Sequence, residues 1–328
     1  MTFLLNSNLS RQWSRIGQRG IYGQSLQELA KENRQIFAIS ADLGNSSGLD
    51  RFKQNHPDRF INIGIAEQNL VGFASGLSTL KFNVFVSSFA PFITMRACEQ
   101  VRLNLGYMQS NVKIVAIGSG VSMGFLGNSH FGLEDISIIR SIPNIPIVCP
   151  ADSFEVYKAV EALSEYEGPA FLRLTGAPPN PIIYKEDYEF NIGKCITIKE
   201  GKDILILSHG QILGNVVKAA NKLEMDNSIS VKIVNVHTLN PLDEKINSLL
   251  SDFQIVVTAE EHSINGGLGT IISETIVNNQ INQINHLKIG LPPHFLKSGT
   301  YEQLLDDYKL SHNGIYKRIF EFYKNSSN

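Results

Sequence analysis

Apolar and polar positions alternate along the first half of this chain in a way that predicts strands and helices in turn. Short apolar runs, typical of buried strands, fall at 35–41, 61–65, 83–88, 111–118, 145–149 and 169–174. Segments with helical spacing of apolar residues separate them, at about 23–33, 66–79, 92–105, 133–141 and 153–165. Ala151-Asp152-Ser153 supplies an N-cap signal for the last of these helices. Strands that alternate with helices predict a parallel sheet covered on both faces.

A proline-rich segment, Gly176-Ala-Pro-Pro-Asn-Pro181, interrupts this alternation, because closely spaced prolines continue neither a helix nor a central strand. Beyond it, strands are expected at 203–208, 230–236, 253–259 and 286–290, with a terminal helix at 313–324. We therefore expect an α/β protein with two parallel-sheet α/β domains. The first covers residues 15–180 and the second residues 201–328, with a linker at 181–200.

The composition excludes several classes of function. The chain has 328 residues, of which 43% are hydrophobic and 18% charged, as in ordinary soluble globular proteins. A net charge of −2 gives no support for binding nucleic acid or an anionic membrane. No apolar run approaches the ~20 residues that span a bilayer, and the N-terminus does not read as a signal peptide. Three cysteines, Cys98, Cys149 and Cys195, lack metal-ligand spacing, and Cys149 is expected to be buried. A cytoplasmic location fits these features.

One carboxylate, Glu67, is expected at a junction between a strand and a helix. An apolar run at 60–65 precedes it, and small residues at helical spacing follow Ala66. Parallel sheets usually keep their active sites at such junctions. The ordinary alternative is an acidic residue in a first helical turn, stabilised by the helix dipole alone. Without the surrounding sequence, this alternative is the more common one for an acidic residue at such a position.

The sequence around Glu67 changes this interpretation. The segment Asn62-Ile-Gly-Ile-Ala-Glu-Gln-Asn69 resembles the pyrimidine-binding domain of the transketolase family, which uses thiamine diphosphate. The resemblance continues through Ser87-Ser-Phe-Ala-Pro-Phe-Ile-Thr-Met-Arg-Ala-Cys-Glu-Gln100 and Gly127-Asn-Ser-His130. It reaches the second half at Pro241-Leu-Asp243 and Glu260-Glu-His-Ser-Ile-Asn-Gly-Gly-Leu-Gly269, and so covers roughly residues 15–325. It implies a thiamine diphosphate pyrimidine-binding domain followed by a transketolase C-terminal domain.

The resemblance assigns several residues to the cofactor. Glu67 would hold a proton against N1′ of the aminopyrimidine, which allows the cofactor to become a nucleophile. Phe89 and Phe92 would contact the flat ring, although a pair at this spacing is more often simple core. Arg96 is either a site residue or the partner of Glu99 at i+3. Asp42 resembles an acid near the cofactor.

The resemblance also implies residues for the substrate. His130 would face the thiazolium and the substrate oxygens and carry protons near neutral pH; its ordinary alternative is a structural loop histidine. Arg19, Ser46 and Arg173 match positions that line the funnel where a sugar phosphate ends, although surface ion pairs are the usual fate of arginine. His262 is expected to be structural.

This chain departs from the family pattern at the acceptor end. Gly124-Phe-Leu-Gly127 replaces the usual Gly-Glu-Asp-Gly, so Leu126 stands where an acid receives the α-hydroxyl of a sugar. Leaving that hydroxyl without a partner costs roughly 1–3 kcal/mol. Gly118 stands where transketolases place a phosphate-contacting histidine. We therefore expect a donor or acceptor other than the pentose phosphates, such as a nucleotide-linked or deoxy sugar or a pyruvate-derived two-carbon unit.

The diphosphate-binding motif of the family, Gly-Asp-Gly followed by Asn, does not occur anywhere in the sequence. The resemblance therefore implies the C-terminal half of a split transketolase. A partner subunit would hold the diphosphate and Mg²⁺, in an α2β2 assembly with the active site at the interface. No metal ligand is expected in this chain.

Three alternatives remain open. The β subunit of a 2-oxo acid dehydrogenase has similar length and domains, but its sequence around the glutamate usually differs. A 1-deoxy-xylulose-5-phosphate synthase has a phosphate-binding arginine where Gly176 stands here. A non-catalytic scaffold is conceivable because the acid at 126 is missing, but it would have no need for Glu67, both phenylalanines and His130 together.

Overall fold

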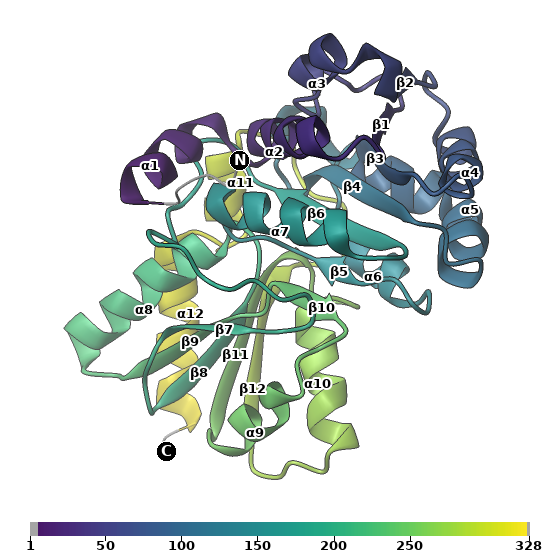
Figure 1. The fold of residues 1–328 in the computed structure, drawn as a ribbon. Helices are drawn as coiled ribbons and strands as arrows, with labels where there is room; N and C mark the ends of the chain where they lie inside the picture. The colour runs from purple at the N-terminus through teal and green to yellow at the C-terminus, as the bar shows by residue number, and fades with distance from the viewer. Residues whose placement is uncertain (1–5, 327–328) are drawn as a thin grey trace.

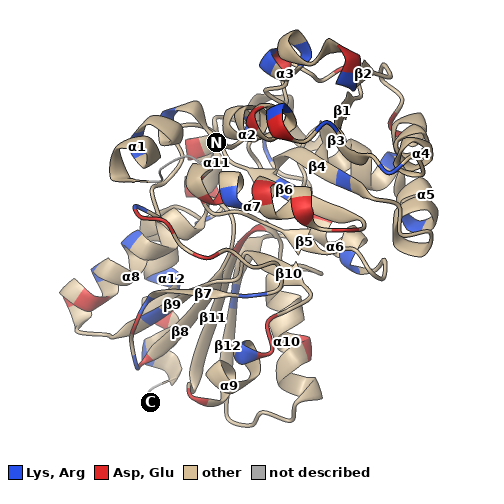
Figure 2. Ribbon diagram, viewed as in Figure 1, with Lys and Arg blue, Asp and Glu red and all other residues tan. Residues whose placement is uncertain are grey.

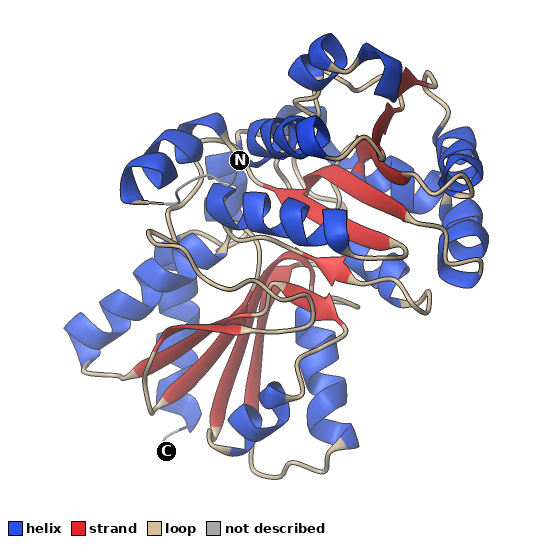
Figure 3. Ribbon diagram, in the orientation of Figure 1, coloured by secondary structure: helices blue, strands red, loops and turns tan. Residues whose placement is uncertain are grey.

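The computed structural model describes residues 6–326 and shows two α/β domains, as the sequence predicts. Figure 1 shows the sheet of the first domain above that of the second, with helices on both faces of each, as the colours of Figure 3 make clear. Among the described residues, no helix combines the length and the apolar character that a membrane crossing requires.

The first sheet has seven strands in the order β10-β5-β6-β4-β3-β1-β2. Its strands are β1 (Ile36–Ser40), β2 (Phe60–Asn62), β3 (Asn83–Phe89), β4 (Val112–Ser119), β5 (Ile147–Val148), β6 (Ala170–Thr175) and β10 (Thr238–Asn240). All pairs are parallel except β10 with β5, where Thr238 pairs with Val148. The edge strand β10 comes from the second half of the chain, a crossover that the sequence does not predict.

Helices cover both faces of this sheet because the residues of its parallel strands are apolar on both sides. In β4, Ile114 packs toward one face and Val115 toward the other. The helical elements of this half are α1 (Ser7–Ile16), α2 (Gln18–Glu32), α3 (Asp50–Asn55), α4 (Glu67–Ser78), α5 (Cys98–Gln100), α6 (Asp135–Arg140) and α7 (Ser153–Glu165), with π-helical turns at Phe92–Arg96 and Val101–Tyr107. Asp152 caps α7, its Oδ1 accepting from Glu155 N at 2.8 Å, as its sequence signal predicts.

The second sheet has five strands in the order β12-β11-β8-β9-β7. These are β7 (Ile196–Lys199), β8 (Ile204–Ser208), β9 (Val231–Asn235), β11 (Ile255–Ser263) and β12 (Asn285–Leu291), all parallel except β7. Its helices are α8 (Leu213–Asn227), α9 (Lys245–Ser251), α10 (Leu268–Asn278), α11 (Tyr301–Asp307) and α12 (His312–Ser326).

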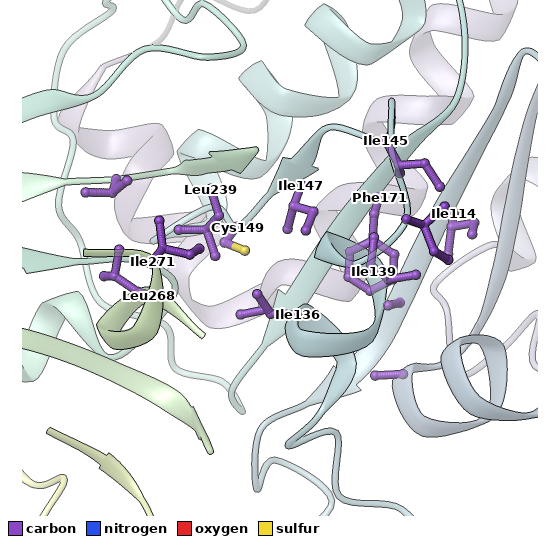
Figure 4. Packing of buried hydrophobic residues seen from close by; sticks show 14 of the residues in the cluster. Ile114, Ile136, Ile139, Ile145, Ile147, Cys149, Phe171, Leu239, Leu268 and Ile271 are labelled. Atoms are coloured by element: carbon purple, nitrogen blue, oxygen red, sulfur yellow. The ribbon is translucent and has the colours of Figure 1, made fainter. Parts of the chain in front are cut away.

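One hydrophobic cluster runs from the first domain into the second. Figure 4 shows part of it, with Ile139 of α6 beside Phe171 of the first domain, and with Leu268 and Ile271 of α10 near Cys149. Cys149 is buried in this cluster, as expected. The charged residues lie mostly on the outer helices and loops, with both signs interspersed (Figure 2). The two domains therefore share part of one hydrophobic core.

Candidate active site

Glu67 is the first residue of α4, directly after the short strand β2 and a loop that contains Gly64 at φ 77°. The left-handed backbone at Gly64 turns the chain out of the sheet before the helix begins. The side chain of Glu67 is only 1% exposed. The junction thus holds a carboxylate out of water, near the carboxyl ends of the parallel strands.

Two side chains hold this carboxylate. Ser88 of β3 donates from Oγ to Glu67 Oε1 at 3.2 Å, and Arg96 donates from Nη1 to Oε2 at 2.5 Å. The Arg96 side chain is 46% exposed, and its guanidinium lies 4.7 Å from the ring centroid of Phe92. Between the two sequence alternatives, the structure pairs Arg96 with Glu67 and not with Glu99. The buried Glu67 carboxylate is therefore separated from solvent on one side only by the partly exposed guanidinium of Arg96.

Phe89, Phe92 and His130 form a group of three rings beside this pair. Their centroids are 5.1 to 5.9 Å apart and every pair is edge-to-face, the arrangement that aromatic rings prefer. His130 Nδ1 lies 2.9 Å from Ser129 Oγ. Through the contact of Arg96 with Phe92, the structure brings Glu67, Arg96, both phenylalanines and His130 into one group.

Asp42 organises the loop that leads to Glu67. Its Oδ1 accepts from Asn62 Nδ2 at 2.9 Å, and its backbone N donates to Asn62 Oδ1 at 3.0 Å. The same Asn62 oxygen accepts from Gly64 N at 3.0 Å. Asn62 is a residue that sequence reasoning did not single out, although it opens the motif.

Arg19 and Ser46, both expected at the substrate end, lie in contact. Arg19 Nη1 donates to the backbone oxygen of Ser46 at 3.3 Å, and burial lowers the pKa of its guanidinium. Gly23 allows this approach, because a Cβ there would lie 1.9 Å from the backbone oxygen of Gly48. Leu126 is 51% exposed, on the loop that carries His130.

Arg173 lies apart from these residues. It is fully buried on β6, and its Nε donates to Asp135 Oδ2 at 2.7 Å. Its Nη2 donates to the backbone oxygens of Gly132 and Glu261, each at 3.1 Å. The structure therefore gives this guanidinium interior partners between the two domains, and it does not reach the group around Glu67.

Two adjoining cavities border the site. One of about 300 Å³ is lined by residues of the first domain, among them Phe92, Met95 and Arg96, and by Phe295 of the second. The other, of about 580 Å³, shares Phe295, Asn128 and Glu134 with it. Burial raises the pKa of the Glu134 carboxyl. Sequence reasoning missed Phe295, whose 88% exposed ring carries no signal beyond the two prolines before it.

The residues of this chain fit one end of thiamine diphosphate. A buried carboxylate with a hydroxyl and a cation beside it, two aromatic rings and a histidine match an aminopyrimidine and a reacting centre. Within residues 6–326, no group of three or more His, Cys, Asp or Glu side chains is arranged to hold a metal ion. The donor set around Glu67 therefore suits the pyrimidine end of the cofactor.

Comparisons with known proteins place the chain in a family. The family model "Transketolase, pyrimidine binding domain" matches residues 15–177, and "Transketolase, C-terminal domain" matches residues 193–315. A "Putative transketolase C-terminal section" of Methanocaldococcus jannaschii is 39% identical, over 93% of this chain and 96% of its own length. A subunit of the apulose-4-phosphate transketolase of Phocaeicola vulgatus is 33% identical, over 93% of this chain and 97% of its own.

A solved structure is similar over nearly its whole length. It is described as "Split gene transketolase, inactive beta4 tetramer", and it superposes with a TM-score of 0.85 at 34% identity. The alignment covers 94% of this chain and 98% of that one. Two family models that together span most of the sequence, and relatives above 30% identity over nearly their full length, leave one conclusion: this chain belongs to the transketolase family.

Proposed function

We propose that this chain is the pyrimidine-binding subunit of a heteromeric, thiamine diphosphate-dependent transketolase. It would transfer a two-carbon ketol, or a related acyl unit, to an aldehyde or ketone acceptor. The observation that carries the proposal is the 1% exposed Glu67 carboxylate, with Ser88 and Arg96 bonded to it and the rings of Phe89, Phe92 and His130 beside it.

Each residue of the group has a role in the proposal. Thiamine diphosphate, when bound, supplies a carbon nucleophile at its thiazolium C2. Glu67 would hold a proton against N1′ of the pyrimidine, while Phe89 and Phe92 would bound the ring and exclude water. The Asp42–Asn62 pair keeps the loop before Glu67 in place. His130 would exchange protons with the substrate oxygens, with Ser129 orienting its ring.

A partner subunit completes the site in this proposal. The sequence has no Gly-Asp-Gly motif, and two of its relatives are named as the C-terminal section of a transketolase and as one subunit of a transketolase. A related split-gene transketolase forms an "inactive beta4 tetramer". These observations support a diphosphate-binding subunit that carries the Gly-Asp-Gly motif and Mg²⁺, in an α2β2 assembly. The active site would then lie between the two kinds of subunit.

The substrate would differ from the pentose phosphates. By the family resemblance, Gly118 and Gly176 stand where phosphate-binding side chains occur, and a side chain at either position would press on a neighbouring side chain here. A Cβ on Gly118 would lie 2.9 Å from Met123 Cγ, and a Cβ on Gly176 would lie 1.8 Å from Gln211 Oε1. Both glycines also have positive φ, 69° and 76°. With Leu126 in place of the acid, the acceptor end favours a non-standard sugar, and Arg19 with Ser46 remains its polar contact.

The test is to co-express this chain with a partner that carries Gly-Asp-Gly and to titrate the complex with thiamine diphosphate and Mg²⁺ by calorimetry. Metal-dependent binding by the pair, absent from either chain alone and lost in Glu67→Ala, supports the proposal. A well-formed complex that binds no cofactor would contradict it and favour the scaffold. Efficient turnover of xylulose 5-phosphate with ribose 5-phosphate would contradict the substrate part alone.

A further inference from the structure

The loop that carries His130, residues 124–133 (the His130 loop), is bonded at both ends to the second domain. At its start, Gly299 N donates to the backbone oxygen of Gly124 at 3.2 Å. A Cβ on Gly124 would lie 2.2 Å from the Gly299 oxygen, so the two backbones are in close contact. At its end, Ser263 N donates to the backbone oxygen of Leu133 at 3.0 Å. Both partners belong to the second half of the chain.

The middle of the loop is tied in the same way. Asn128 Oδ1 accepts from the backbone N of Leu296 at 2.8 Å, and Asn128 Nδ2 donates to the Leu296 oxygen at 2.6 Å. A Cβ on Gly127 would lie 2.4 Å from Ser298 Oγ. The Asn128 side chain therefore pairs with a backbone of the second domain two residues before His130.

The Arg173 side chain makes hydrogen bonds to both domains next to the end of the His130 loop. Its guanidinium is fully buried and reaches three acceptors: the Asp135 carboxylate, the backbone oxygen of Gly132 and the backbone oxygen of Glu261. A planar guanidinium with several fixed N–H donors suits such a set, which a lysine ammonium could not match. Gly132 lies two residues after His130, so this contact holds the end of the loop against β11.

Glu261 binds the segment at residues 120–121, which pairs with the end of the His130 loop. Its Oε1 accepts from Val121 N at 2.8 Å, and its Oε2 accepts from Tyr301 Oη at 2.7 Å. The neighbouring Gly120 exchanges two backbone hydrogen bonds with Gly132, at 2.8 and 3.0 Å. A Cβ on Gly120 would lie 2.1 Å from Glu261 Oε1, so the Glu261 side chain packs directly on the Gly120 backbone.

We propose that the C-terminal domain positions His130 for catalysis, and that Arg173, Glu261 and Asn128 are the positioning residues through which it acts. The proposal rests on the proposed function, because it takes His130 to be the proton carrier. In this proposal Arg173 holds the His130 loop and does not contact the substrate. The ends and the middle of the His130 loop depend on bonds to the second domain, while Phe125 and Leu126 between them are exposed.

The experiment compares variants of Glu261, which is buried and belongs to the second domain. Glu261→Ala removes both contacts. Glu261→Gln is the conservative variant, because its amide oxygen can still accept from Val121 N and its NH2 can face the Tyr301 oxygen. The matched control is Glu274→Ala, which removes a different interdomain contact, the ion pair of Arg140 with Glu274, without touching the loop. Each variant is studied in complex with the partner subunit.

Two readouts are needed, amide hydrogen exchange and steady-state kinetics. In Glu261→Ala we expect exchange in residues 120–133 to speed up about tenfold or more while α4 keeps its protection. We expect kcat to fall about 10- to 100-fold, because a small displacement of a reacting group has effects of this size. The dissociation constant for thiamine diphosphate should stay within about twofold. Glu261→Gln and Glu274→Ala should behave like the wild type.

The proposal is overturned if Glu261→Ala matches the wild type in exchange, or if Glu274→Ala loses as much turnover. A general loss of protection that includes α4 would also overturn it, since it would indicate loss of folding. If the wild-type complex binds no cofactor, the proposed function fails. The exchange comparison then still decides whether the second domain holds the loop.

Discussion

Glu67 and Glu155 are both buried carboxylates of the first domain, and their surroundings differ in kind. Glu67 is 1% exposed, yet its ion-pair partner Arg96 is 46% exposed. Glu155 is fully buried on α7, and no cation is among its bonded partners. It accepts instead from Ala151 N, Tyr188 Oη and Asn235 Nδ2, at 2.6, 3.1 and 2.9 Å.

The surroundings of Glu155 are closed. Asp152 lies beside it, and its Oδ2 accepts from the backbone N of Ile183 and Tyr184 at 2.8 and 3.0 Å. The two acids thereby join α7 to the linker and to Asn235 of β9. Desolvation raises the pKa of Asp152 to about 6 and that of Glu155 to about 7. These bonds connect three parts of the chain, so Glu155 and Asp152 have a structural role.

Burial alone therefore does not distinguish a candidate catalytic acid from a structural one. The two acids differ in how a ligand could reach them. Glu67 lies at a strand–helix junction, and its neighbours Phe92 and Arg96 line a cavity. Glu155 borders none of the described cavities. A ligand could replace the exposed cation at Glu67 at little cost, whereas displacing any partner of Glu155 would leave a buried group unsatisfied.

The largest expected effect is on turnover. Glu67→Gln in the complex should lower kcat about a hundredfold or more, since general acid–base groups contribute on this scale. Its free energy of unfolding should change by less than about 1 kcal/mol, because the freed Arg96 can turn to water. The matched control, Glu155→Gln, should keep kcat within about twofold. Steady-state assays and urea titrations check both, and equal losses in the two variants would refute the distinction.

The next effect is on stability. Glu155→Ala should destabilise the chain by about 2–4 kcal/mol, because it leaves several buried donors without an acceptor. Glu155→Gln should cost about 1 kcal/mol or less, since Asn235 Oδ1, which has no partner among the described contacts, can accept from the new amide. Urea unfolding of both variants measures the difference. A cost below about 0.5 kcal/mol for the alanine variant would contradict the structural role.

The last expected effect is the pH dependence of stability. The folded pKa of Glu155, about 7, lies above its ordinary 4.5, so the folded state binds the proton more tightly than the unfolded chain. Its contribution to stability is complete below pH ~4.5 and is lost as the pH rises through ~7. Between these limits, the unfolding free energy of the wild type should fall relative to Glu155→Gln by on the order of 3 kcal/mol. A flat difference from pH 4 to 8 in urea titrations would exclude the raised pKa.

Much of the local structure was predictable from local pattern. The strand–helix junction at Glu67 was predicted because an apolar run and helical spacing meet there, and α4 begins at Glu67. The cap at Asp152 followed from its side-chain chemistry. In contrast, α1 and the edge strand β10 were not predicted, since the first is mostly polar and the second is only three residues long.

The site was predictable in part, for a related reason. Two motifs, residues 62–69 and 87–100, supply the residues around the carboxylate: Glu67, Phe89, Phe92 and Arg96. They lie on elements that pack together directly, so local sequence places these residues near one another. Phe295 and Asn128 lie far apart in the chain, and their approach depends on how the two domains meet. Arg173 illustrates the limit best. Its match to a family position that lines the substrate funnel suggested a substrate ligand, but the side chain donates to Asp135 in the domain interface.

The sequence by itself determined the family, the two α/β domains and the residues around Glu67, because hydrophobic periodicity and local motifs act over short distances along the chain. Only the tertiary structure decided which arginine stays at the site and which is buried, and that the second domain holds the His130 loop. The physical reason is that buried charges and backbone groups must find partners wherever folding brings them, and those partners can be any number of residues away.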